Sequence, residues 1–300
     1  MDLSYLQAVV IGILQGVTEL FPISSLGHSV LVPAWLGGSW ERLVVAQSDP
    51  ESPYLAFIVA LHVATASALL VLFWRDWVGI VRGFVSSVRT RSISTTYERM
   101  AWLIVVSTIP AGITGLLLEH TLRTVFAKPL AAAVFLTVNG LILLGGEWLR
   151  RRAPEHRDIS VSADTEAAGA VDRAIAAQIS PRDAGIIGVL QTAALLPGIS
   201  RSGITMVGGL LRGLTHEEAL RFSFLLATPI ILAAGVYKVP DLLGPLGDGI
   251  RGQALAGAAA AFVAALVAAR FLERWFRTRT LLPFAVYCLV AGAISVVHFA

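Results

Sequence analysis

The sequence predicts an all-α polytopic membrane protein with six spanning helices and two re-entrant helical hairpins, arranged as an inverted repeat. Three observations predict this fold class: the composition, six long apolar stretches, and two short apolar stretches that are each followed by a break. Of the 300 residues, 56% are hydrophobic and only 14% are charged, whereas soluble domains carry about 25% charged residues. The net charge of +3 is too small to indicate a nucleic-acid partner.

Six stretches are long and apolar enough to cross a bilayer, because a spanning helix needs about 20 mostly apolar residues. They cover residues 54–74, 100–118, 130–149, 219–237, 254–272 and 281–299. Thr215 and Glu218, three positions apart, predict a capping box that opens the fourth stretch. Cys288 is the single cysteine and lies in the last stretch, so we expect a buried thiol and neither a disulfide nor a cysteine-based zinc site.

Two further apolar segments, residues 6–20 and 186–196, are too short to span. Each is followed by a cluster rich in Pro, Gly and Ser: residues 21–28 read Phe-Pro-Ile-Ser-Ser-Leu-Gly-His, and residues 197–203 read Pro-Gly-Ile-Ser-Arg-Ser-Gly. Irregular backbone is tolerated at membrane depth only where protein or a water-filled cavity satisfies its polar groups. The two broken segments therefore predict re-entrant hairpins.

The two broken segments also match each other at one fixed offset. A shift of 176 residues without gaps aligns Gly12 with Gly188, Leu14 with Leu190, Gln15 with Gln191, Leu20 with Leu196, Ile23 with Ile199, Ser24 with Ser200 and Gly27 with Gly203. Each half then holds one hairpin and three spans, so the second half must insert upside down. Short interrupted segments at corresponding places of an inverted repeat mark a binding site.

Loop charges predict the orientation. Loops 75–99, 150–182 and 274–279 together carry fourteen arginines, whereas the loops of the other side carry five basic residues. The positive-inside bias places the arginine-rich loops in the cytoplasm. Both termini and the opening of the first hairpin then lie outside, which predicts a pocket open to the extracytoplasmic face.

The whole chain, residues 1–300, is expected to form a single membrane domain. The halves cover about 1–150 and 183–300, and a polar cytoplasmic connector of about 151–182 joins them. Residues 153–180 hold few large apolar groups, so we expect a flexible connector.

Ionisable residues within membrane segments are functional candidates by default, and here Glu19, His28 and Arg201 lie in the hairpins. Gly198 and Gly203 permit tight turns around Arg201. A helix that begins near Ser202 would present free N–H groups to an anion, and the guanidinium suits phosphate oxygens. Together they predict a diphosphate site. A structural Glu19–Arg201 ion pair that locks the hairpins is the alternative, and the two can coexist.

Ser25 and His28 are three positions apart and can share one face of a helical turn. A serine hydroxyl needs a base before it acts as a nucleophile. His28 or Glu19 could be that base. For other residues we expect structural roles: the histidines have no partner at ligand-like spacing and the glutamates lie at span ends near the interface. These residues are His62, His120, His156, His216, His298, Glu119 and Glu147.

Residues 15–28, Gln-Gly-Val-Thr-Glu-Leu-Phe-Pro-Ile-Ser-Ser-Leu-Gly-His, strongly resemble the first signature of the undecaprenyl-diphosphatase (bacitracin-resistance) family. Residues 197–205, Pro-Gly-Ile-Ser-Arg-Ser-Gly-Ile-Thr, resemble its second signature. The likeness continues at residues 109–112, 222–227 and 282–287, and so covers nearly the whole chain.

The resemblance implies hydrolysis of undecaprenyl diphosphate to undecaprenyl phosphate and inorganic phosphate, which recycles the lipid carrier for peptidoglycan synthesis. It also implies a divalent cation, Mg²⁺ or Ca²⁺, and low-level bacitracin resistance. The implied catalytic residues are Glu19, Ser25, His28 and Arg201, with Glu19 as metal ligand. The expected substrate-binding residues are Gln15, Ser24, Gly198, Ser200, Ser202, Gly203 and Thr205.

The chain departs from the family at Gln15, where many members have glutamate. Gln15 cannot be a carboxylate base or an anionic metal ligand, so those roles fall on Glu19. In our preferred scheme Ser25 attacks the terminal phosphorus, His28 assists proton transfer and Arg201 with the metal stabilises the phosphoryl oxygens. In the rival scheme His28 is the nucleophile.

Two other functions remain to be weighed. A polyprenyl-phosphate flippase or transporter could use the same inverted-repeat site, but transport of an anion needs Arg201 and not Ser25 beside His28. A type-2 phosphatidic-acid-phosphatase-like enzyme is excluded, because no histidine follows Ser200-Arg201 within residues 206–212. The expected partners are the polyprenyl diphosphate substrate and membrane lipids, with a homodimer as a candidate assembly.

Overall fold

A computed structural model describes residues 3–43, 53–126, 128–152 and 167–300, and these residues form helices and turns without a strand. The predicted all-α class is therefore confirmed. In chain order, the helices are α1 (Tyr5–Thr18), α2 (Ser25–Leu36), α4 (Pro53–Leu72), α5 (Trp74–Thr90), α6 (Thr96–Phe126), α7 (Pro129–Arg152), α8 (Ala167–Gln178), α9 (Pro181–Gln191), η1 (Thr192–Leu195), α10 (Arg201–Leu210), α11 (His216–Lys238), α12 (Pro240–Leu243), η2 (Pro245–Gly247), α13 (Arg251–Trp275) and α14 (Leu282–Phe299).

Six of the described helices are long and apolar enough to span a membrane, as predicted. They are α4, α6, α7, α11, α13 and α14. The largest difference from the predicted ranges is at α6, which continues to Phe126 although its apolar part ends at Leu118. The predicted capping box is present at the start of α11, where the Thr215 side chain accepts from the backbone N–H of Glu218.

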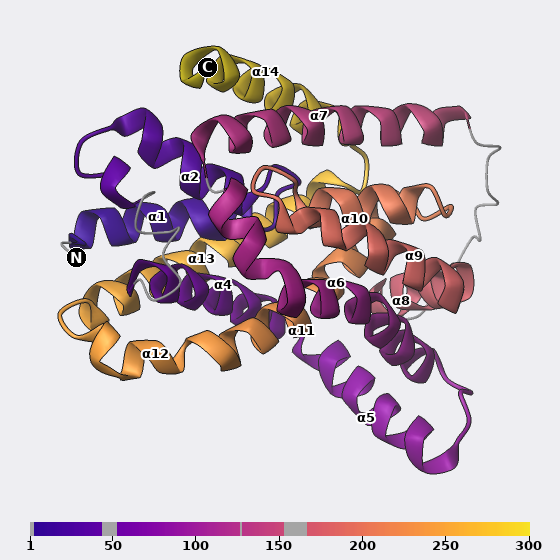
Figure 1. Ribbon diagram of the computed structural model, residues 1–300. Helices are drawn as coiled ribbons and strands as arrows, with labels where there is room; N and C mark the ends of the chain where they lie inside the picture. The colour runs from indigo at the N-terminus through magenta and orange to yellow at the C-terminus, as the bar shows by residue number, and fades with distance from the viewer. Residues whose placement is uncertain (1–2, 44–52, 127, 153–166) are drawn as a thin grey trace.

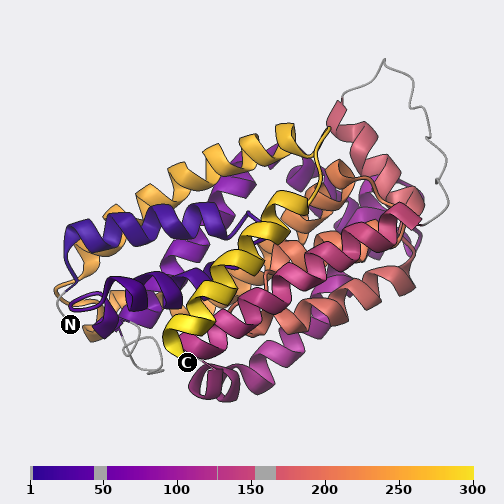
Figure 2. The ribbon, with the colours of Figure 1, turned by 90° about the horizontal axis from the view of Figure 1, so that it is seen from above.

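The first and last parts of the chain pack against each other. Figures 1 and 2 show both termini at the same end of the bundle, with α13 along α1 and α14 along α7. A Cβ atom at Gly12 would overlap the carbonyl of Gly257, and one at Gly140 would lie 2.9 Å from the backbone nitrogen of Leu289. Small residues let helix backbones approach closely in membrane proteins, so these contacts bring the two halves together.

The short helices α1 and α2 extend into the bundle from the end that holds the termini, and α9 and α10 lie toward the other end (Figure 1). The first turn of α2 touches the segment that leads into α10, because a Cβ atom at Gly27 would lie 2.9 Å from Cα of Gly198. Both pairs are broken where the sequence predicts. Their re-entry into a membrane and the inverted repeat stay predictions.

The expected flexible connector is wrong for residues 167–178, which form α8; residues 153–166 lie outside the described part. Ile175 is fully buried in α8, and the buried Asp172 pairs with Arg221 of α11 at 3.1 Å. Arg221 also pairs with Asp76 of α5 at 2.7 Å. Burial raises the pKa of Asp172. Only a narrow face of α8 is buried, so its sequence needs few large apolar residues and hydropathy does not predict the helix.

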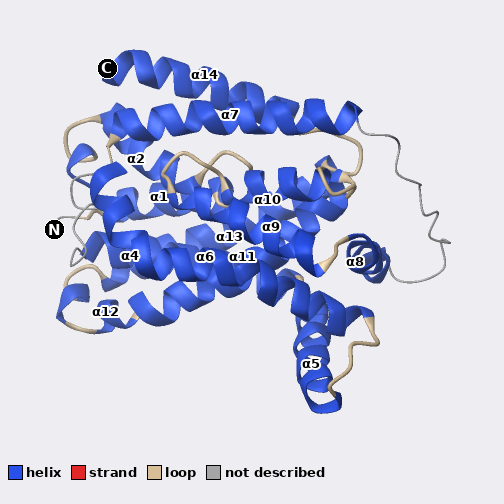
Figure 3. Cartoon of the chain, turned by 45° about the vertical axis from the view of Figure 1, so that its right-hand side comes forward, coloured by secondary structure: helices blue, strands red, loops and turns tan. Residues whose placement is uncertain are grey.

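The arginine-rich loop expected at residues 75–99 contains a further helix, α5. Figure 3 shows α5 directed away from the bundle, across the direction of the long helices. Its buried face holds Asp76, Ile80, Gly83 and Ser87, and this face packs on α6.

Candidate active site

The two breaks between the short helices are held by equivalent hydrogen bonds. The Ser24 hydroxyl accepts from the backbone N–H of Gly27 at 3.2 Å, and the Ser200 hydroxyl accepts from that of Gly203 at 3.1 Å. The Ser24 hydroxyl also accepts from the N–H of Gly198 at 3.1 Å. The two serines therefore cap α2 and α10, and Ser24 joins the two breaks.

Gly198 is a glycine for conformational and steric reasons. Its φ of +114° is a conformation that other residues rarely adopt. A Cβ atom there would also lie 2.5 Å from the carbonyl oxygen of Ala132 in α7. The second break therefore fits against α7 only with glycine at this position, which gives Gly198 a structural role besides its predicted place in the substrate site.

Asn139 of α7 connects the same two breaks, and sequence reasoning missed it. Its side-chain nitrogen donates to the Pro22 carbonyl at 3.0 Å, and its side-chain oxygen accepts from the backbone N–H of Ser200 at 2.9 Å. Asn139 is fully buried. A polar amide in the middle of an apolar span was the available signal.

Glu19 and Arg201 meet as predicted. Nη2 of Arg201, at the start of α10, lies 2.6 Å from Oε1 of Glu19, at the end of α1. Glu19 is only 7% exposed. The second terminal nitrogen of Arg201, Nη1, is buried and has no hydrogen-bond partner among the described residues. A guanidinium that holds a carboxylate with one nitrogen and leaves the other unpaired can still bind a phosphate oxygen.

The Ser25 hydroxyl, at the start of α2, donates a hydrogen bond to Oε2 of Glu19. The side-chain amide of Gln15, one turn earlier in α1, donates to the same oxygen at 3.2 Å. Ser25 and Gln15 are both buried. The structure therefore places the serine against a carboxylate, which can take its proton.

His62 of α4 completes this cluster, contrary to the expectation that it has no partner. Its Nε2 lies 3.3 Å from Oε2 of Glu19, and its Nδ1 lies 2.8 Å from the carbonyl of Ile58. A carbonyl only accepts, so Nδ1 carries a proton. A hydrogen bond between Nε2 and Glu19 then needs one further proton, on the histidine or on the carboxylate. His62 and Glu19 therefore form a pair that can share a proton.

His28 has other partners than Ser25. Its Nδ1 lies 2.7 Å from the carbonyl of Ser24, and its Nε2 lies 2.7 Å from the hydroxyl of Tyr287 in α14. With Nδ1 donating to the carbonyl, a neutral ring accepts the Tyr287 hydroxyl at Nε2. Both ring nitrogens are thus used in bonds that orient α2 against α14.

The remaining predicted binding residues lie beside the cluster, and several of their polar groups bond to protein. The Ser202 hydroxyl donates to the Phe21 carbonyl at 3.0 Å, and the Thr205 hydroxyl donates to the Ser223 hydroxyl at 2.7 Å. A Cβ atom at Gly203 would lie 3.1 Å from the Leu143 side chain. These contacts position α10, and with it Arg201.

The expectation that Glu147 lies at the interface and that His216 lacks a partner is wrong. Glu147 is only 1% exposed and lies 2.8 Å from Nε2 of His216. The pair joins α7 to the start of α11, and we assign it a structural role. Cys288 is a buried free thiol, as predicted. The side chains of Glu119, His120 and His156 lie outside the described residues.

The donors at the site bear on the predicted divalent cation. The described residues contain no group of three or more His, Cys, Asp or Glu side chains that could together hold a metal ion. Magnesium is often held by one or two carboxylates together with substrate phosphates. Glu19, with the Gln15 side chain beside it, fits such a site but not an all-protein cage.

The chain is similar to known proteins over nearly its full length. Residues 8–294 match the family model described as bacitracin resistance protein BacA. The chain is 60% identical to the undecaprenyl-diphosphatase of Mycolicibacterium paratuberculosis, with 99% of this chain and 98% of the relative covered. It is 55% identical to undecaprenyl-diphosphatase 2 of Frankia alni, with 100% and 99% covered, and 45% identical to the undecaprenyl-diphosphatase of Granulibacter bethesdensis, with 100% and 99% covered.

Proposed function

The chain belongs to the bacitracin resistance protein BacA family, and we propose that it hydrolyses undecaprenyl diphosphate to undecaprenyl phosphate and inorganic phosphate. The names of its relatives favour this phosphatase activity over the flippase alternative. The activity recycles the lipid carrier used in cell-wall biogenesis. The chain is a multi-pass membrane protein, with six described helices of spanning length and composition.

One observation supports the assignment of the chemistry most directly. The Ser25 hydroxyl donates to one oxygen of Glu19 while Arg201 contacts the other oxygen at 2.6 Å. Phosphoryl transfer needs a positioned nucleophile, a group that takes its proton, and cations for the charge on the phosphoryl oxygens. Ser25, Glu19 and Arg201 supply these in one buried cluster.

In the proposed first step, Oγ of Ser25 attacks the terminal phosphorus and its proton passes to Glu19. The new O–P bond forms as the bond to the bridging oxygen breaks, and undecaprenyl phosphate leaves with that electron pair. Nη1 of Arg201 donates to a phosphoryl oxygen. In the second step, water attacks the phosphoserine, the Ser25 O–P bond breaks, Glu19 returns its proton to Oγ, and both protons of the water stay on the phosphate oxygens. Inorganic phosphate then leaves.

The two histidines take different parts in this scheme. His28 acts as a positioning residue, because its Nε2 bonds to Tyr287 and its Nδ1 to the Ser24 carbonyl. The rival scheme with His28 as nucleophile would require Nε2 to leave Tyr287. His62 stabilises the charge on Glu19 before the first step and can share the proton that Glu19 receives.

A divalent cation, Mg²⁺ or Ca²⁺, is part of the proposal. Glu19 would hold it, with Gln15 at most as a neutral ligand and substrate phosphates in the remaining positions. When bound, it would neutralise charge on the phosphoryl oxygens. Removing divalent cations with EDTA should abolish turnover and adding Mg²⁺ or Ca²⁺ should restore it. Full activity in EDTA would exclude the cation.

The activity is tested by phosphate release from undecaprenyl diphosphate in detergent, where no second compartment exists. Ser25→Ala and Glu19→Gln should each lose nearly all turnover, while Ser67→Ala, a hydroxyl removed from α4 outside the cluster, should retain it. Release of no phosphate by the wild type would refute the activity and revive the flippase.

The nucleophile is tested by quenching the reaction within one turnover and mapping the labelled residue. A phosphoserine at Ser25 is the expected result. A phosphohistidine at His28 would overturn the scheme and would support the rival one.

We further propose that the protein lies in the inner (plasma) membrane with its site open to the extracytoplasmic side, as the loop arginines predict. Ser39 follows α2 and Ser92 follows α5 in the chain, and both are exposed. Figure 1 shows α2 near the end of the bundle that holds the termini and α5 toward the other end. In intact cells with a permeabilised outer layer, an impermeant thiol reagent should label Ser39→Cys and spare Ser92→Cys. The reverse pattern would overturn the orientation. The candidate homodimer stays a prediction.

A further inference from the structure

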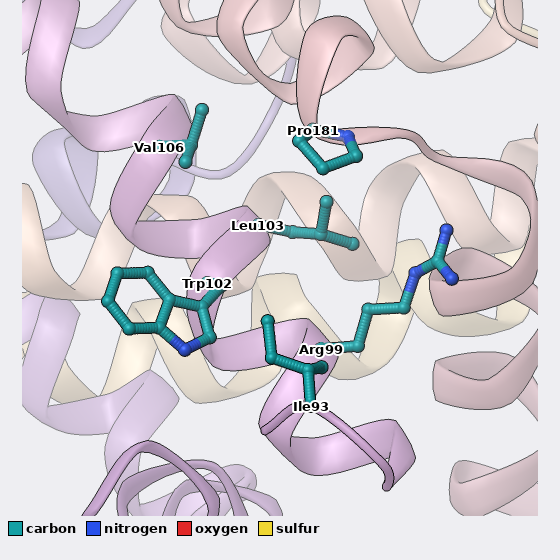
Figure 4. Close-up of a pocket in the computed structure, with 6 residues that line it drawn as sticks. All are labelled: Ile93, Arg99, Trp102, Leu103, Val106 and Pro181. Atoms are coloured by element: carbon teal, nitrogen blue, oxygen red, sulfur yellow. The ribbon is translucent and has the colours of Figure 1, made fainter. Parts of the chain in front are cut away.

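A furrow runs along the outer surface between α6 and α9, away from the Glu19 cluster. It consists of two adjoining cavities of about 270 and 520 Å³ that share Val106 as a wall. Figure 4 shows the first cavity, with Leu103 at its centre, Trp102 on one side and Arg99 on the other. The second continues past Ile109 and Pro110 of α6 and faces Gly185 and Val189 of α9.

The floor of the furrow is formed where the two helices touch. The Ser107 hydroxyl donates to the carbonyl of Ala184 at 2.8 Å, and a Cβ atom at Gly188 would lie 2.5 Å from the carbonyl of Ser107. Gly185, three residues earlier on α9, faces open space, because a Cβ atom there would meet only Val106, at 3.8 Å. The helices therefore pack tightly at depth and leave a gap toward the surface.

The walls of the furrow are apolar except at one end. Arg99 lines the first cavity and Arg182 the second. Arg99 donates to the backbone carbonyl of Ile179 at 3.4 Å, and Asp183, the neighbour of Arg182, pairs with Arg212 instead. Within the described residues, neither Arg99 nor Arg182 has a carboxylate within 4.0 Å. Both cations are exposed and free to hold an anion.

The length of the furrow matches one leaflet. Arg99 and Pro110 are eleven residues apart on one helix, which corresponds to about 16 Å at 1.5 Å per residue. Half of a bilayer's hydrocarbon core is about 15 Å thick. A lipid with its phosphate near Arg99 would therefore extend an acyl chain along α6 to about the depth of Pro110. A polyprenyl chain of eleven units is much longer than this furrow.

Helix α5 has the side-chain pattern of a helix that lies at the level of the lipid headgroups. Arg75, Arg82 and Arg89 recur at seven-residue spacing and form an exposed row along it. Exposed apolar side chains lie beside this row: Trp74, Val78, Val81, Phe84, Val85 and Val88. A basic row next to an apolar face is typical of a helix that lies in the membrane interface. Phe84 of α5 contacts Trp102, with ring centroids 5.4 Å apart. Because Trp102 lines the first cavity, the furrow begins next to α5.

We propose that the α6–α9 furrow binds one anionic membrane phospholipid of the leaflet on the arginine-rich side. Its phosphate contacts Arg99 and Arg182, and one acyl chain lies against Trp102, Val106 and Ile109. The site is separate from the phosphatase cluster, so a lipid bound here does not compete with the substrate for Arg201.

Native mass spectrometry of the delipidated full-length protein tests the proposal, with dioleoylphosphatidylglycerol and dioleoylphosphatidylcholine as probes. The wild type should bind one phosphatidylglycerol molecule more tightly than the rest, and phosphatidylcholine at least tenfold more weakly. The double variant Arg99→Gln/Arg182→Gln should weaken this binding roughly 10- to 100-fold, which corresponds to about 1.4–2.8 kcal/mol for the two contacts together at an exposed site. Gly185→Leu, which fills the gap, should abolish it.

Matched controls separate the furrow from general charge and bulk. Arg274→Gln/Arg279→Gln removes two exposed charges from the same end of the molecule, and Gly145→Leu adds a side chain on α7 where nothing lies within 4 Å. Both should bind like the wild type. Equal binding of the two lipids, unchanged binding by the furrow variants, or displacement of phosphatidylglycerol by an equimolar polyprenyl phosphate would each overturn the proposal.

Discussion

Replacing Arg201 by lysine separates its two contacts. Nη2 holds Glu19 at 2.6 Å, whereas Nη1 is buried and has no hydrogen-bond partner in the part of the chain that the structure describes. A lysine keeps the positive charge beside Glu19 but has a single nitrogen, so it cannot hold Glu19 and also present a second nitrogen to the phosphate. One hydrogen bond to a charged group is then lost in the transition state, at about 1.5–3 kcal/mol. We expect kcat to fall roughly 10- to 150-fold.

The assay is phosphate release from undecaprenyl diphosphate in detergent, together with thermal unfolding of the same preparation. Arg201→Lys should unfold close to the wild-type temperature because the pair with Glu19 remains. Arg201→Ala should unfold earlier, since an unpaired buried carboxylate costs about 3–5 kcal/mol. Arg212→Lys, which alters a partly exposed pair with Asp183, is the matched control and should change neither quantity. Wild-type kcat in Arg201→Lys would refute the reasoning, because it would show that Nη1 contacts no phosphate.

Three further predictions concern the cluster and its supports. His62→Gln should lower kcat about 10²-fold in the same assay, because a neutral amide cannot share a proton with Glu19; a kcat within threefold of wild type would contradict this role. Gly198→Ala should destabilise the protein by about 2 kcal/mol or more in thermal unfolding, since it combines a positive φ with an overlap, while Gly145→Ala should be nearly neutral. The hydrogen bond from Ser180 lowers the pKa of Asp183. The stabilisation of the folded protein by this bond is therefore present above about pH 4 and is lost as the pH falls further. The difference in unfolding temperature between wild type and Ser180→Ala should therefore shrink toward acid, and a constant difference from pH 3 to 6 would count against that bond.

Much of the fold could be predicted because its causes are local. The spanning helices follow from runs of about 20 apolar residues, and the breaks at Pro22 and Gly198 follow from the restricted backbone of proline and the positive φ of glycine. The capping box needs only Thr215 and, three positions later, Glu218. Helix α8 was missed because its buried face is narrow and its partner Arg221 lies 49 positions away.

The candidate site was predicted in part. Glu19, Ser25 and Arg201 stand in motifs whose residue types indicate phosphate chemistry, and the meeting of Glu19 with Arg201 is confirmed. The sequence allows either His28 or Glu19 as the proton partner of Ser25, and the geometry favours Glu19. The catalytic and metal-binding roles stay predictions.

The all-α membrane class, the six spans, the broken segments and the family can be predicted from the amino-acid sequence, because hydropathy, turn chemistry and motifs are properties of short stretches of chain. The contacts of His62 with Glu19, of Tyr287 with His28 and of Asn139 with the two breaks appear only in the folded chain. Each residue turns by about 100° around a helix, so the direction of a side chain in an apolar span depends on which helices pack against it. That packing is set by contacts between residues far apart in the chain, such as Gly12 with Gly257, and local composition does not record it.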